Sequence, residues 1–364
     1  MPTLFTPFTL KDVTLRNRIA ASPMCQYQAQ DGFLNDWHHT HYAMLARGGV
    51  GLLVVEATAV SPEGRITPGD AGLWSDAHID GFADVATVIK QAGAVPGIQL
   101  GHAGRKAGCT PPWQGGAPLE RNDPQAWEPV APSALPFIPG DAYVPREMTQ
   151  EDIQQTCENF ASAARRAVDA GFKWLELHFA HGFLAQSFLS SHTNMRTDEY
   201  GGALENRARF LLETVAAVKK VWPENLPLTV RLGVVEFDAS PEHSFSESLQ
   251  VSRWLKAAGV DILDVGLALS TPSEQVPWAP NFMVPYAERV RRETGLPVAT
   301  SWMITRATDA DTFIQDAKLD VVFFARTLLT HPHWPFLAAR ELNVSRPETV
   351  LPTPYAYWLQ NSAG

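Results

Sequence analysis

The sequence of 364 residues has few cysteines and no long hydrophobic run. Its three cysteines, Cys25, Cys109 and Cys157, are odd in number and far apart along the chain, so neither a disulfide framework nor a thiolate metal site is expected. No apolar stretch approaches the roughly 20 residues of a membrane span, and the N-terminus lacks the pattern of a signal peptide. These absences predict a protein of the cytoplasm.

Clusters of positive charge are also missing. The formal net charge is −10, and no run of Lys or Arg reaches four residues. Neither a nucleic acid nor a membrane surface is therefore expected as a partner. Apolar residues make up 45% of the chain and charged residues 19%, which is the balance of a globular protein, and the length suits one large domain over residues 1–364.

Eight short apolar runs rich in Val, Ile and Leu recur along the chain. They lack the alternation of a half-exposed strand, which is how strands buried on both faces of a parallel sheet read. The sequence therefore predicts eight parallel strands, at residues 18–22, 51–57, 96–100, 174–179, 228–233, 262–268, 297–302 and 320–326.

Segments with helical spacing lie between the runs, and five of them end in a glycine before the next strand: Gly49, Gly93, Gly171, Gly259 and Gly295. This repeated order of helix, glycine cap and strand is typical of α/β proteins. Thr149 and Asp152 suit the N-terminal cap of a helix that continues to residue 171, and a second helix is expected over 204–221. Together these features predict a (β/α)₈ TIM barrel, with a doubly wound open sheet as the alternative.

One long segment interrupts this order. Residues 108–148, after the third strand, are dense in Pro, Gly and Trp. A loop of this length inside a compact domain is usually functional or disordered. We expect it to form a lid over the mouth of the barrel, and we expect residues 350–364 to form a C-terminal tail.

In a TIM barrel the chemistry lies at the carboxyl ends of the strands, so the residues there are the candidate site. No hydrolase triad and no pair of carboxylates stands at these ends.

His102, His178 and His181 lack the further ligand that a barrel metallohydrolase needs, so no metal is expected. His39 and His41 are two apart in a predicted helix, point to different sides, and are interpreted as structural. The candidates are Ser22, Pro23, Met24, Cys25, Ala57, Thr58, Gln99, His102, His178, His181, Arg231, Trp302 and Arg326.

Three motifs make the sequence similar to a known family. They are SPMCQY (22–27), ELHFAHGFLAQSFLS (176–190) and SHTNMRTDEYGGALENRARF (191–210). With them, nearly the whole chain resembles the Old Yellow Enzyme family of flavin-dependent ene-reductases, and in particular its bacterial branch with a cysteine in the first-strand motif. The resemblance implies bound FMN, with NADPH as the expected reductant and NADH as a further possibility. No G-x-G-x-x-G dinucleotide fingerprint is present, so the nicotinamide would visit the substrate's own site.

The resemblance also implies where FMN would lie. Ser22, Pro23, Met24 and Cys25 would line one side of the ring, and Ala57 and Gln99 would reach its polar edge. Arg231 would stabilise the negative charge of the reduced flavin.

The phosphate of FMN would bind at Arg326 and at positions 303 and 325. The family usually has glycines where Met303 and Ala325 stand. A side chain there could crowd the phosphate or forbid a positive φ, so weaker flavin retention is one expectation.

His178 and His181 would bind the carbonyl or nitro oxygen of the substrate, as the donors of an oxyanion hole do. Cys25 would modulate the flavin, and Tyr27 and Trp302 would border the substrate. Trp358 lies where related enzymes pass a tail residue into a neighbouring subunit, which implies a homodimer or a larger assembly.

Phe183 occupies the position where the family normally has a proton-donating tyrosine. A positioned general acid contributes roughly 10²- to 10⁴-fold to a rate, so alkene reduction would have to rely on water, on Tyr27 or on a slower route. Three interpretations stay open. The protein is an ene-reductase of α,β-unsaturated carbonyl compounds with a substitute donor, a reductase of quinones or nitro compounds, or a flavin-binding protein that isomerises or desaturates its ligand or is not catalytic.

Overall fold

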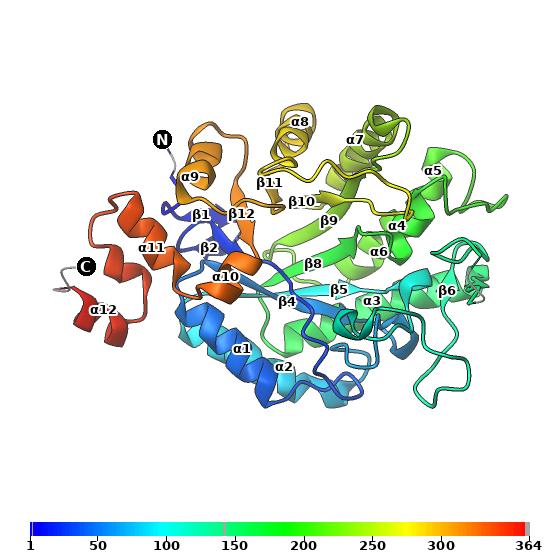
Figure 1. The fold of residues 1–364 in the computed structure, drawn as a ribbon, viewed down its shortest axis with the longest axis horizontal. Helices are drawn as coiled ribbons and strands as arrows, with labels where there is room; N and C mark the ends of the chain where they lie inside the picture. The colour runs from blue at the N-terminus through cyan, green and yellow to red at the C-terminus, as the bar shows by residue number, and fades with distance from the viewer. Residues whose placement is uncertain (2, 141–142, 361–364) are drawn as a thin grey trace.

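The computed structural model describes residues 1, 3–140 and 143–360. Eight parallel strands close into a barrel in the order β10, β11, β12, β3, β4, β5, β8, β9, and the helices form an outer ring around them (Figure 1). A closed barrel confirms the (β/α)₈ prediction and excludes the open sheet. The strands are β3 (Ile19–Ala21), β4 (Leu52–Ala59), β5 (Val95–Gly101), β8 (Trp174–Phe179), β9 (Leu228–Val235), β10 (Ile262–Leu267), β11 (Val298–Thr300) and β12 (Val321–Phe324).

Each of the eight predicted runs overlaps one barrel strand. β8, β9 and β10 are buried at every residue, which is why their sequences are apolar without alternation. The few charged side chains in these strands therefore lie inside the protein, where they need partners.

The main helices of the ring are α1 (Asp36–Arg47), α2 (Ile79–Gln91), α3 (Gln150–Asp169), α6 (Arg209–Lys219), α7 (Pro241–Ala257), α8 (Val284–Thr294) and α9 (Ala307–Gln315). The predicted cap of α3 is confirmed, because Asp152 N donates to Thr149 Oγ1 at 3.1 Å and Thr149 N donates to Asp152 Oδ2 at 2.8 Å. The predicted glycine ends are confirmed as well, for example at Gly171 (φ 90°) and Gly295 (φ 67°). His39 is exposed on α1 and His41 is buried, as their spacing predicted.

The single helix predicted over 204–221 is wrong. Helix α5 (Leu204–Arg207) ends at Ala208, and α6 begins with the next residue. The buried guanidinium of Arg207 donates to the backbone carbonyls of Leu189 and Gly202. These contacts fix the first turn against the preceding loop, a tertiary constraint that helical spacing does not show.

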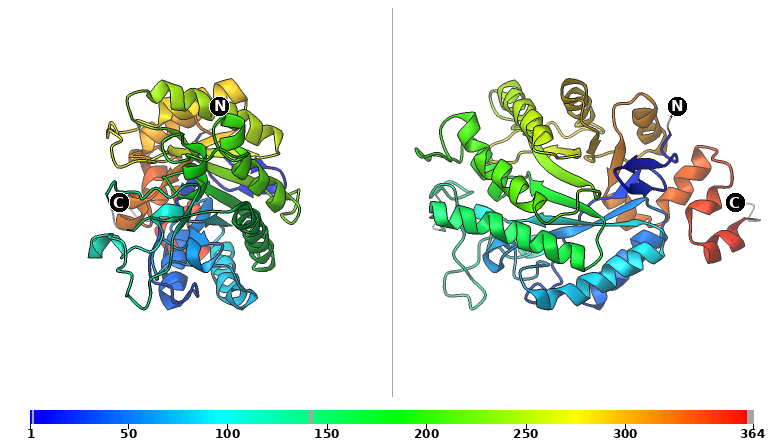
Figure 2. Two further views of the ribbon diagram at one scale, coloured as in Figure 1. Left: turned by 90° about the vertical axis from the view of Figure 1, so that its right-hand side faces the viewer. Right: turned by 180° about the vertical axis from the view of Figure 1, so that it is seen from behind.

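The remaining elements lie outside the repeat. An antiparallel pair, β1 (Phe8–Leu10) and β2 (Val13–Leu15), contacts the residues before β9 and β10 through Asp12 and Lys11, and so covers the amino ends of those strands. After β12 come α10 (Arg326–Thr330), α11 (Trp334–Glu341) and α12 (Thr353–Leu359). Figure 1 and the right view of Figure 2 show α11 and α12 at one end of the molecule, outside the ring.

The described residues of the segment 108–148 form only short elements. They contain the 3₁₀ turn η4 (Pro112–Gln114) and two short strands, β6 (Val130–Ala131) and β7 (Arg146–Glu147), which pair with each other in parallel. Part of this predicted lid, residues 141–142, and the end of the predicted tail, residues 361–364, lie outside the described residues. Short 3₁₀ turns occur also at η1 (Pro62–Gly64), η2 (Asp76–His78), η3 (Gly104–Lys106) and η5 (Pro347–Val350). Within the described ranges, no helix is both long and apolar enough to span a bilayer.

Candidate active site

Four rings meet where β8 ends. The centroids of His178 and His181 lie 4.8 Å apart, and those of His178 and Phe183 lie 5.0 Å apart, both edge to face. The Trp302 ring stands 5.5 Å from His181 at 90°. His181 has φ 61°, a left-handed conformation that turns the chain back after β8 and places both imidazoles on one side of the mouth. The structure thus brings together the predicted histidine pair, Phe183 and Trp302.

Both histidines are neutral at pH 7. Burial first, and then the positive charges of Arg231 and Lys106, hold the pKa of His178 well below its usual range, and burial with Arg231, His178 and Lys106 does the same for His181. In the described part of the chain, His178 Nδ1 and His181 Nε2 are buried and have no hydrogen-bond partner. Buried polar atoms are normally satisfied, so these two nitrogens point to a polar ligand.

Arg231 is held inside the barrel by groups that sequence reasoning missed. Its Nε lies 3.2 Å from Asp264 Oδ2 on β10, and its Nη2 lies 3.4 Å from Ser301 Oγ. On the neighbouring strand pair, Gln99 Nε2 donates to Glu176 Oε1 at 2.7 Å. Glu176 and Asp264 stand within apolar strand runs, and a charge in a strand buried on both faces is a signal that could have identified them.

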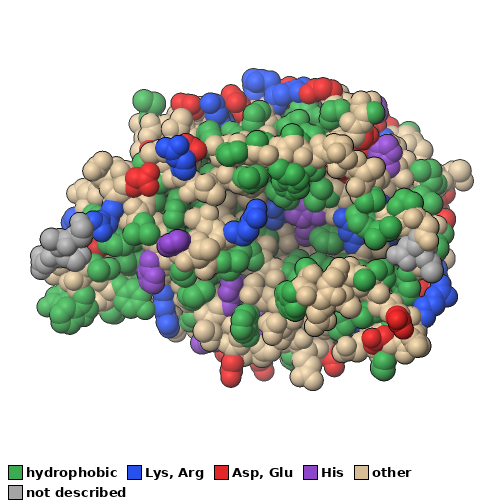
Figure 3. All heavy atoms as spheres, in the orientation of Figure 1, with side chains coloured by type: hydrophobic (Ala, Val, Ile, Leu, Met, Phe, Trp, Pro, Cys, Tyr) green, Lys and Arg blue, Asp and Glu red, His purple; other side chains and the backbone are tan. Residues whose placement is uncertain are grey.

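A cavity of about 480 Å³ opens beside these groups, and FMN fits its residues. Cofactor sites are commonly clefts of roughly 300–1,000 Å³ with a few convergent polar groups. Among the described residues, buried polar atoms without a hydrogen-bond partner include His181 Nε2, Ser22 Oγ and Trp302 Nε1. The lining includes Ser22, Pro23, Arg231, Met303, Ala325 and Arg326, which are six of the ten predicted FMN contacts. Figure 3 shows histidine side chains and basic side chains, coloured blue for Lys or Arg, around a central hollow of this face.

The other four predicted FMN contacts do not line that cavity. Met24 and Cys25 are half-buried in the loop after β3. Ala57 lines a separate cavity of about 10 Å³ together with His102, His178 and Phe183. Gln99 is 2% exposed and bonded to Glu176.

The predicted phosphate end of the cavity has an unusual backbone. Trp302 and Met303 have φ 57° and 64°, so the side chain of Met303 does not forbid a positive φ, although it is strained there. Ala325 has φ −120° and ψ −92°, which requires no left-handed backbone. Arg326 lines the cavity and is exposed.

Glu56 of β4 fixes the loop that carries Cys25. Gln26 N donates to Glu56 Oε2 at 2.8 Å, and Tyr42 OH on α1 donates to Glu56 Oε1 at 2.8 Å. Burial raises the pKa of Glu56 to about 8 and lowers the pKa of His38 to about 4. Both groups are therefore neutral at pH 7, so their 3.6 Å contact is not an ion pair at that pH.

Cys25 remains a thiol at neutral pH. Burial raises its pKa well above the usual range, and the carboxyl groups of Asp70 and Glu56 raise it further, whereas a hydrogen bond with Tyr27 lowers it. Burial also raises the pKa of Tyr27. The pair is thus a neutral thiol and a neutral phenol, not a reactive thiolate.

A second cavity, of about 220 Å³, joins Tyr27, Lys106 and Phe183. Lys106 was missed by sequence reasoning. Its Nζ donates to the carbonyl oxygens of His181 at 2.6 Å and Leu269 at 2.9 Å, and lies 4.1 Å from the ring centroid of Phe137. Burial and Arg105 lower its pKa to about 7.

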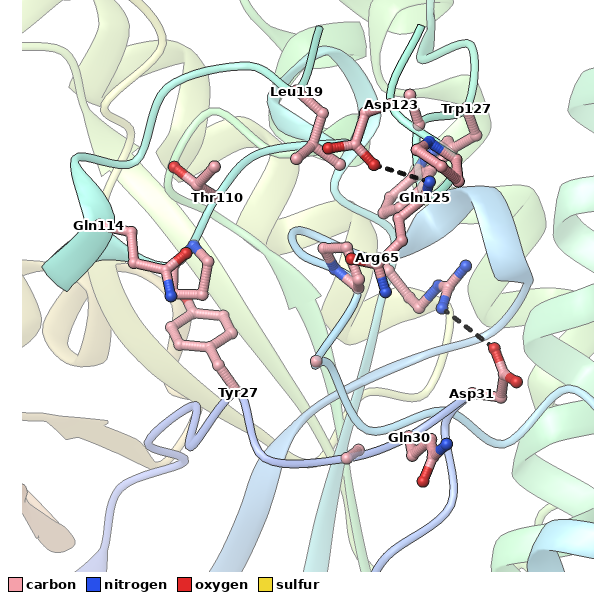
Figure 4. Close-up of a pocket in the computed structure, with 16 residues that line it drawn as sticks. Tyr27, Gln30, Asp31, Arg65, Thr110, Gln114, Leu119, Asp123, Gln125 and Trp127 are labelled. Atoms are coloured by element: carbon pink, nitrogen blue, oxygen red, sulfur yellow. Dashed lines mark hydrogen bonds and ion pairs between the residues drawn. The ribbon is translucent and has the colours of Figure 1, made fainter. Parts of the chain in front are cut away.

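A wider groove of about 660 Å³ begins at Tyr27 and extends over the segment 108–148. In Figure 4, Arg65 lies near its middle, with Tyr27 on one side and Trp127 on the other. The Arg65 guanidinium lies 4.7 Å from the Trp127 ring and 3.9 Å from Asp31. This groove connects the candidate site with the predicted lid.

Trp358 is not brought to the site of its own chain. It lies on α12 and is 79% exposed, and it lines none of the cavities found among the described residues. Its predicted role in a neighbouring subunit stays a prediction.

A family model and a relative of known name both match nearly the whole chain. The NADH:flavin oxidoreductase / NADH oxidase family matches residues 3–345. An NADPH dehydrogenase of Bacillus velezensis is 42% identical over 356 residues, which cover 97% of this chain and 98% of the relative.

Two solved structures are similar across nearly the whole fold. Morphinone reductase in complex with tetrahydroNAD has a TM-score of 0.76 and 28% identity, covering 95% of this chain and 92% of that protein. The old yellow enzyme homologue from Zymomonas mobilis has a TM-score of 0.77 and 26% identity, covering 94% of each chain.

Proposed function

The chain belongs to the NADH:flavin oxidoreductase / NADH oxidase family, the family of Old Yellow Enzyme, and from this membership we propose that it uses NADPH to reduce the activated C=C bonds of α,β-unsaturated carbonyl compounds. It is an FMN-dependent oxidoreductase. The chemistry that FMN supplies when bound is hydride transfer. The observation that carries the proposal is the pair of neutral histidines with unpartnered ring nitrogens, of which His181 lines the 480 Å³ cavity and His178 packs edge to face against it.

His178 and His181 would hold the carbonyl oxygen of the acceptor. Negative charge builds on that oxygen as the β-carbon accepts hydride, and N–H groups already aimed at it lower the barrier. The buried Arg231 adds positive charge on the same side of the cavity. Trp302, edge to face with His181, would exclude water from the bound acceptor.

The reductant is proposed to be NADPH because the relatives at about 40% identity are named NADPH dehydrogenases. The nicotinamide would bind over the same histidines and leave before the acceptor enters. Binding of the nicotinamide and the acceptor in turn at one site requires no separate dinucleotide-binding motif, and the sequence has no such fingerprint.

The proton for the α-carbon cannot come from Phe183. Two protic groups line the same 220 Å³ cavity as Phe183, the hydroxyl of Tyr27 and the ammonium of Lys106. A general acid works best when its pKa is near the working pH, which favours Lys106, with a pKa of about 7, over Tyr27, whose pKa burial raises.

A second candidate function rests on the same residue. Quinones and nitro compounds are protonated on oxygen or nitrogen, so they do not need the carbon acid that Phe183 lacks. For these acceptors the two histidines would bind the quinone or nitro oxygen in the same way.

Product analysis tests the proposal. The FMN-loaded protein is supplied with NADPH and cyclohexenone, or with NADPH and benzoquinone, and the products are quantified for wild type, His178→Ala, His181→Ala and His39→Ala. We expect cyclohexanone from wild type and from His39→Ala, an exposed histidine of α1, with losses of about 10²- to 10³-fold for the two site variants, as for an oxyanion donor. If the protein reduces benzoquinone but not cyclohexenone, quinone or nitro reduction replaces alkene reduction as its function.

A further inference from the structure

A group of three side chains outside the active site has the composition of a metal centre. His192, Glu236 and Asp238 bring one ring nitrogen and two carboxylate oxygens within 4.8 Å of one another. His192 stands in the turn after α4 (Leu184–Leu189), and the two acids follow β9. We propose that these three residues bind a divalent transition-metal ion, of which Zn²⁺ is the representative.

The distances suit coordination. His192 Nε2 lies 2.8 Å from Asp238 Oδ2 and 3.5 Å from Glu236 Oε2. Ligands about 2.0–2.2 Å from one zinc ion in a tetrahedron stand roughly 3.3–3.6 Å apart. The His192–Glu236 distance lies in that range, whereas His192 and Asp238 form a shorter hydrogen bond that an ion would replace. Since all three ligand atoms lie within 4.8 Å of one another, side-chain rotations would bring them onto one ion.

Glu236 supplies an independent indication of a missing ligand. The residue is 6% exposed, and its Oε1 is a buried atom without a hydrogen-bond partner in the described chain. A buried carboxylate oxygen normally has a partner, and no ion pair joins Glu236 to Arg105 among those described. Arg105 instead donates to the carbonyl oxygens of Pro136 and Ser270.

The ligands are oriented by their surroundings. Ser240 N donates to Asp238 Oδ1 at 2.7 Å, which leaves Oδ2 facing His192. Asn194, 5% exposed, anchors the turn of His192 by donating to the carbonyl oxygens of Phe188 and Tyr200, both at 2.7 Å. Outer contacts of this kind set the geometry of metal ligands.

Access and ligand type favour a transition metal. The His192 side chain is 46% exposed, so an ion can enter from solvent, and water can complete the coordination. Imidazole binds Zn²⁺ and its neighbours in preference to Mg²⁺ or Ca²⁺, which take oxygen ligands. Bound metal would join the turn after α4 to the end of the strand that carries Arg231.

The test measures zinc uptake by the FMN-loaded protein. Wild type, His192→Ala and His243→Ala are treated with chelator, incubated with excess ZnCl₂ and desalted, and zinc is counted by mass spectrometry. His243 is the matched control, because its side chain is 72% exposed and has one carboxylate neighbour, Glu247, at 3.7 Å. Zinc bound at Cys25 or at the active-site histidines is common to all three proteins, so only the difference is diagnostic.

We expect His192→Ala to carry one zinc per chain fewer than wild type and His243→Ala, and zinc to raise the Tm of the latter two only. Glu236→Gln, which keeps the shape of the side chain, should weaken zinc binding by more than about tenfold, since it alters a direct ligand. Equal zinc in wild type, His192→Ala and Glu236→Gln would overturn the proposal and leave water as the partner of Glu236. Competition by a large excess of Mg²⁺ would overturn the assignment to a transition metal. None of these readouts depends on the reaction proposed above.

Discussion

Phe183 is the residue on which alkene reduction depends most directly. Its ring centroid lies 5.0 Å from that of His178 and 6.3 Å from that of His181, so the position that lacks the hydroxyl stands next to the histidine pair. The chain instead offers Tyr27 and Lys106, which line the 220 Å³ cavity on which Phe183 also borders.

We expect Phe183→Tyr to accelerate reoxidation of the reduced flavin by cyclohexenone, because it restores a positioned acid for the α-carbon. The gain has an upper range of about 10²- to 10⁴-fold. Single-turnover stopped-flow traces measure it, with benzoquinone as the control acceptor, whose rate should not change. A Phe183→Tyr rate within twofold of wild type for cyclohexenone would show that an existing group already protonates the carbon efficiently.

Met303 is strained at the predicted phosphate end of the flavin site, with φ 64°. A left-handed conformation costs an L-residue about 1–2 kcal/mol. Glycine avoids this cost, but it loses more conformational entropy on folding, which offsets about 0.5–1 kcal/mol of the gain. We expect Met303→Gly to raise the free energy of unfolding by up to about 1 kcal/mol and to lower the Kd of FMN, since the backbone becomes open to the phosphate.

Ala325→Gly is the matched comparison, because Ala325 has φ −120° and no left-handed strain to relieve. It should lower stability slightly. Urea unfolding and fluorescence titration with FMN measure both variants, and a loss of stability in Met303→Gly equal to that in Ala325→Gly would contradict the assignment of strain.

At the scale of elements, Glu56 joins the loop after β3 to helix α1. Its carboxyl accepts hydrogen bonds from Gln26 N and Tyr42 OH. The pKa of Glu56 is about 8 in the folded protein, against an ordinary value of 4.5. Between pH 4.5 and pH 8 the folded protein therefore keeps a proton on Glu56 that the unfolded chain has released. Its contribution to stability is thus complete below pH 4.5 and is lost as pH rises to 8, by up to about 1.4 kcal/mol per pH unit.

We expect Glu56→Gln to remove that dependence, because an amide does not titrate. The Tm of the variant relative to wild type should therefore rise steadily from pH 5 to pH 8. Glu158→Gln, an exposed glutamate on α3, is the control. Parallel Tm curves for wild type and Glu56→Gln would contradict the raised pKa.

The sequence predicts the elements of this fold well for a physical reason. Strands buried on both faces must be apolar throughout, and glycine caps mark the helix ends, so β8 to β10 and α3 are visible in the sequence. Helix α5 and α6 were predicted as one because the contacts of Arg207 that separate them come from Leu189 and Gly202, which spacing along a helix does not reveal.

The candidate site was predictable where one motif carries its own geometry, as in His178, His181 and Phe183. Lys106 could not be found this way, because its position depends on carbonyl oxygens of His181 and Leu269, distant in sequence. The His192, Glu236 and Asp238 cluster likewise forms only when two loops meet.

At the scale of the whole molecule, the exposed C-terminal helix leads to a prediction about assembly. Trp358 is 79% exposed and Tyr357 61% exposed, and large exposed aromatic side chains next to each other are typical of interaction surfaces. The family resemblance implies that Trp358 reaches the site of a neighbouring subunit.

We expect the protein to elute as a dimer or a larger assembly, and Trp358→Ala to raise KM for the acceptor by about three- to tenfold, the loss of one aromatic contact. At low protein concentration, Trp358→Ala should have the same Tm as wild type, because an exposed side chain contributes little to the stability of the monomer. Light scattering and steady-state kinetics measure these properties. A monomer, or an unchanged KM, would contradict the shared site.

The most direct test of flavin-dependent alkene reduction by this protein follows the flavin through both half-reactions. The purified protein is placed under nitrogen, its visible flavin absorption is recorded, NADPH is added until the absorption bleaches, and cyclohexenone is then mixed in. We expect a yellow protein whose flavin absorption is bleached by NADPH and restored by cyclohexenone, with slower restoration in His178→Ala. A colourless protein that FMN cannot reconstitute, or a reduced flavin that cyclohexenone leaves bleached, would contradict flavin-dependent alkene reduction.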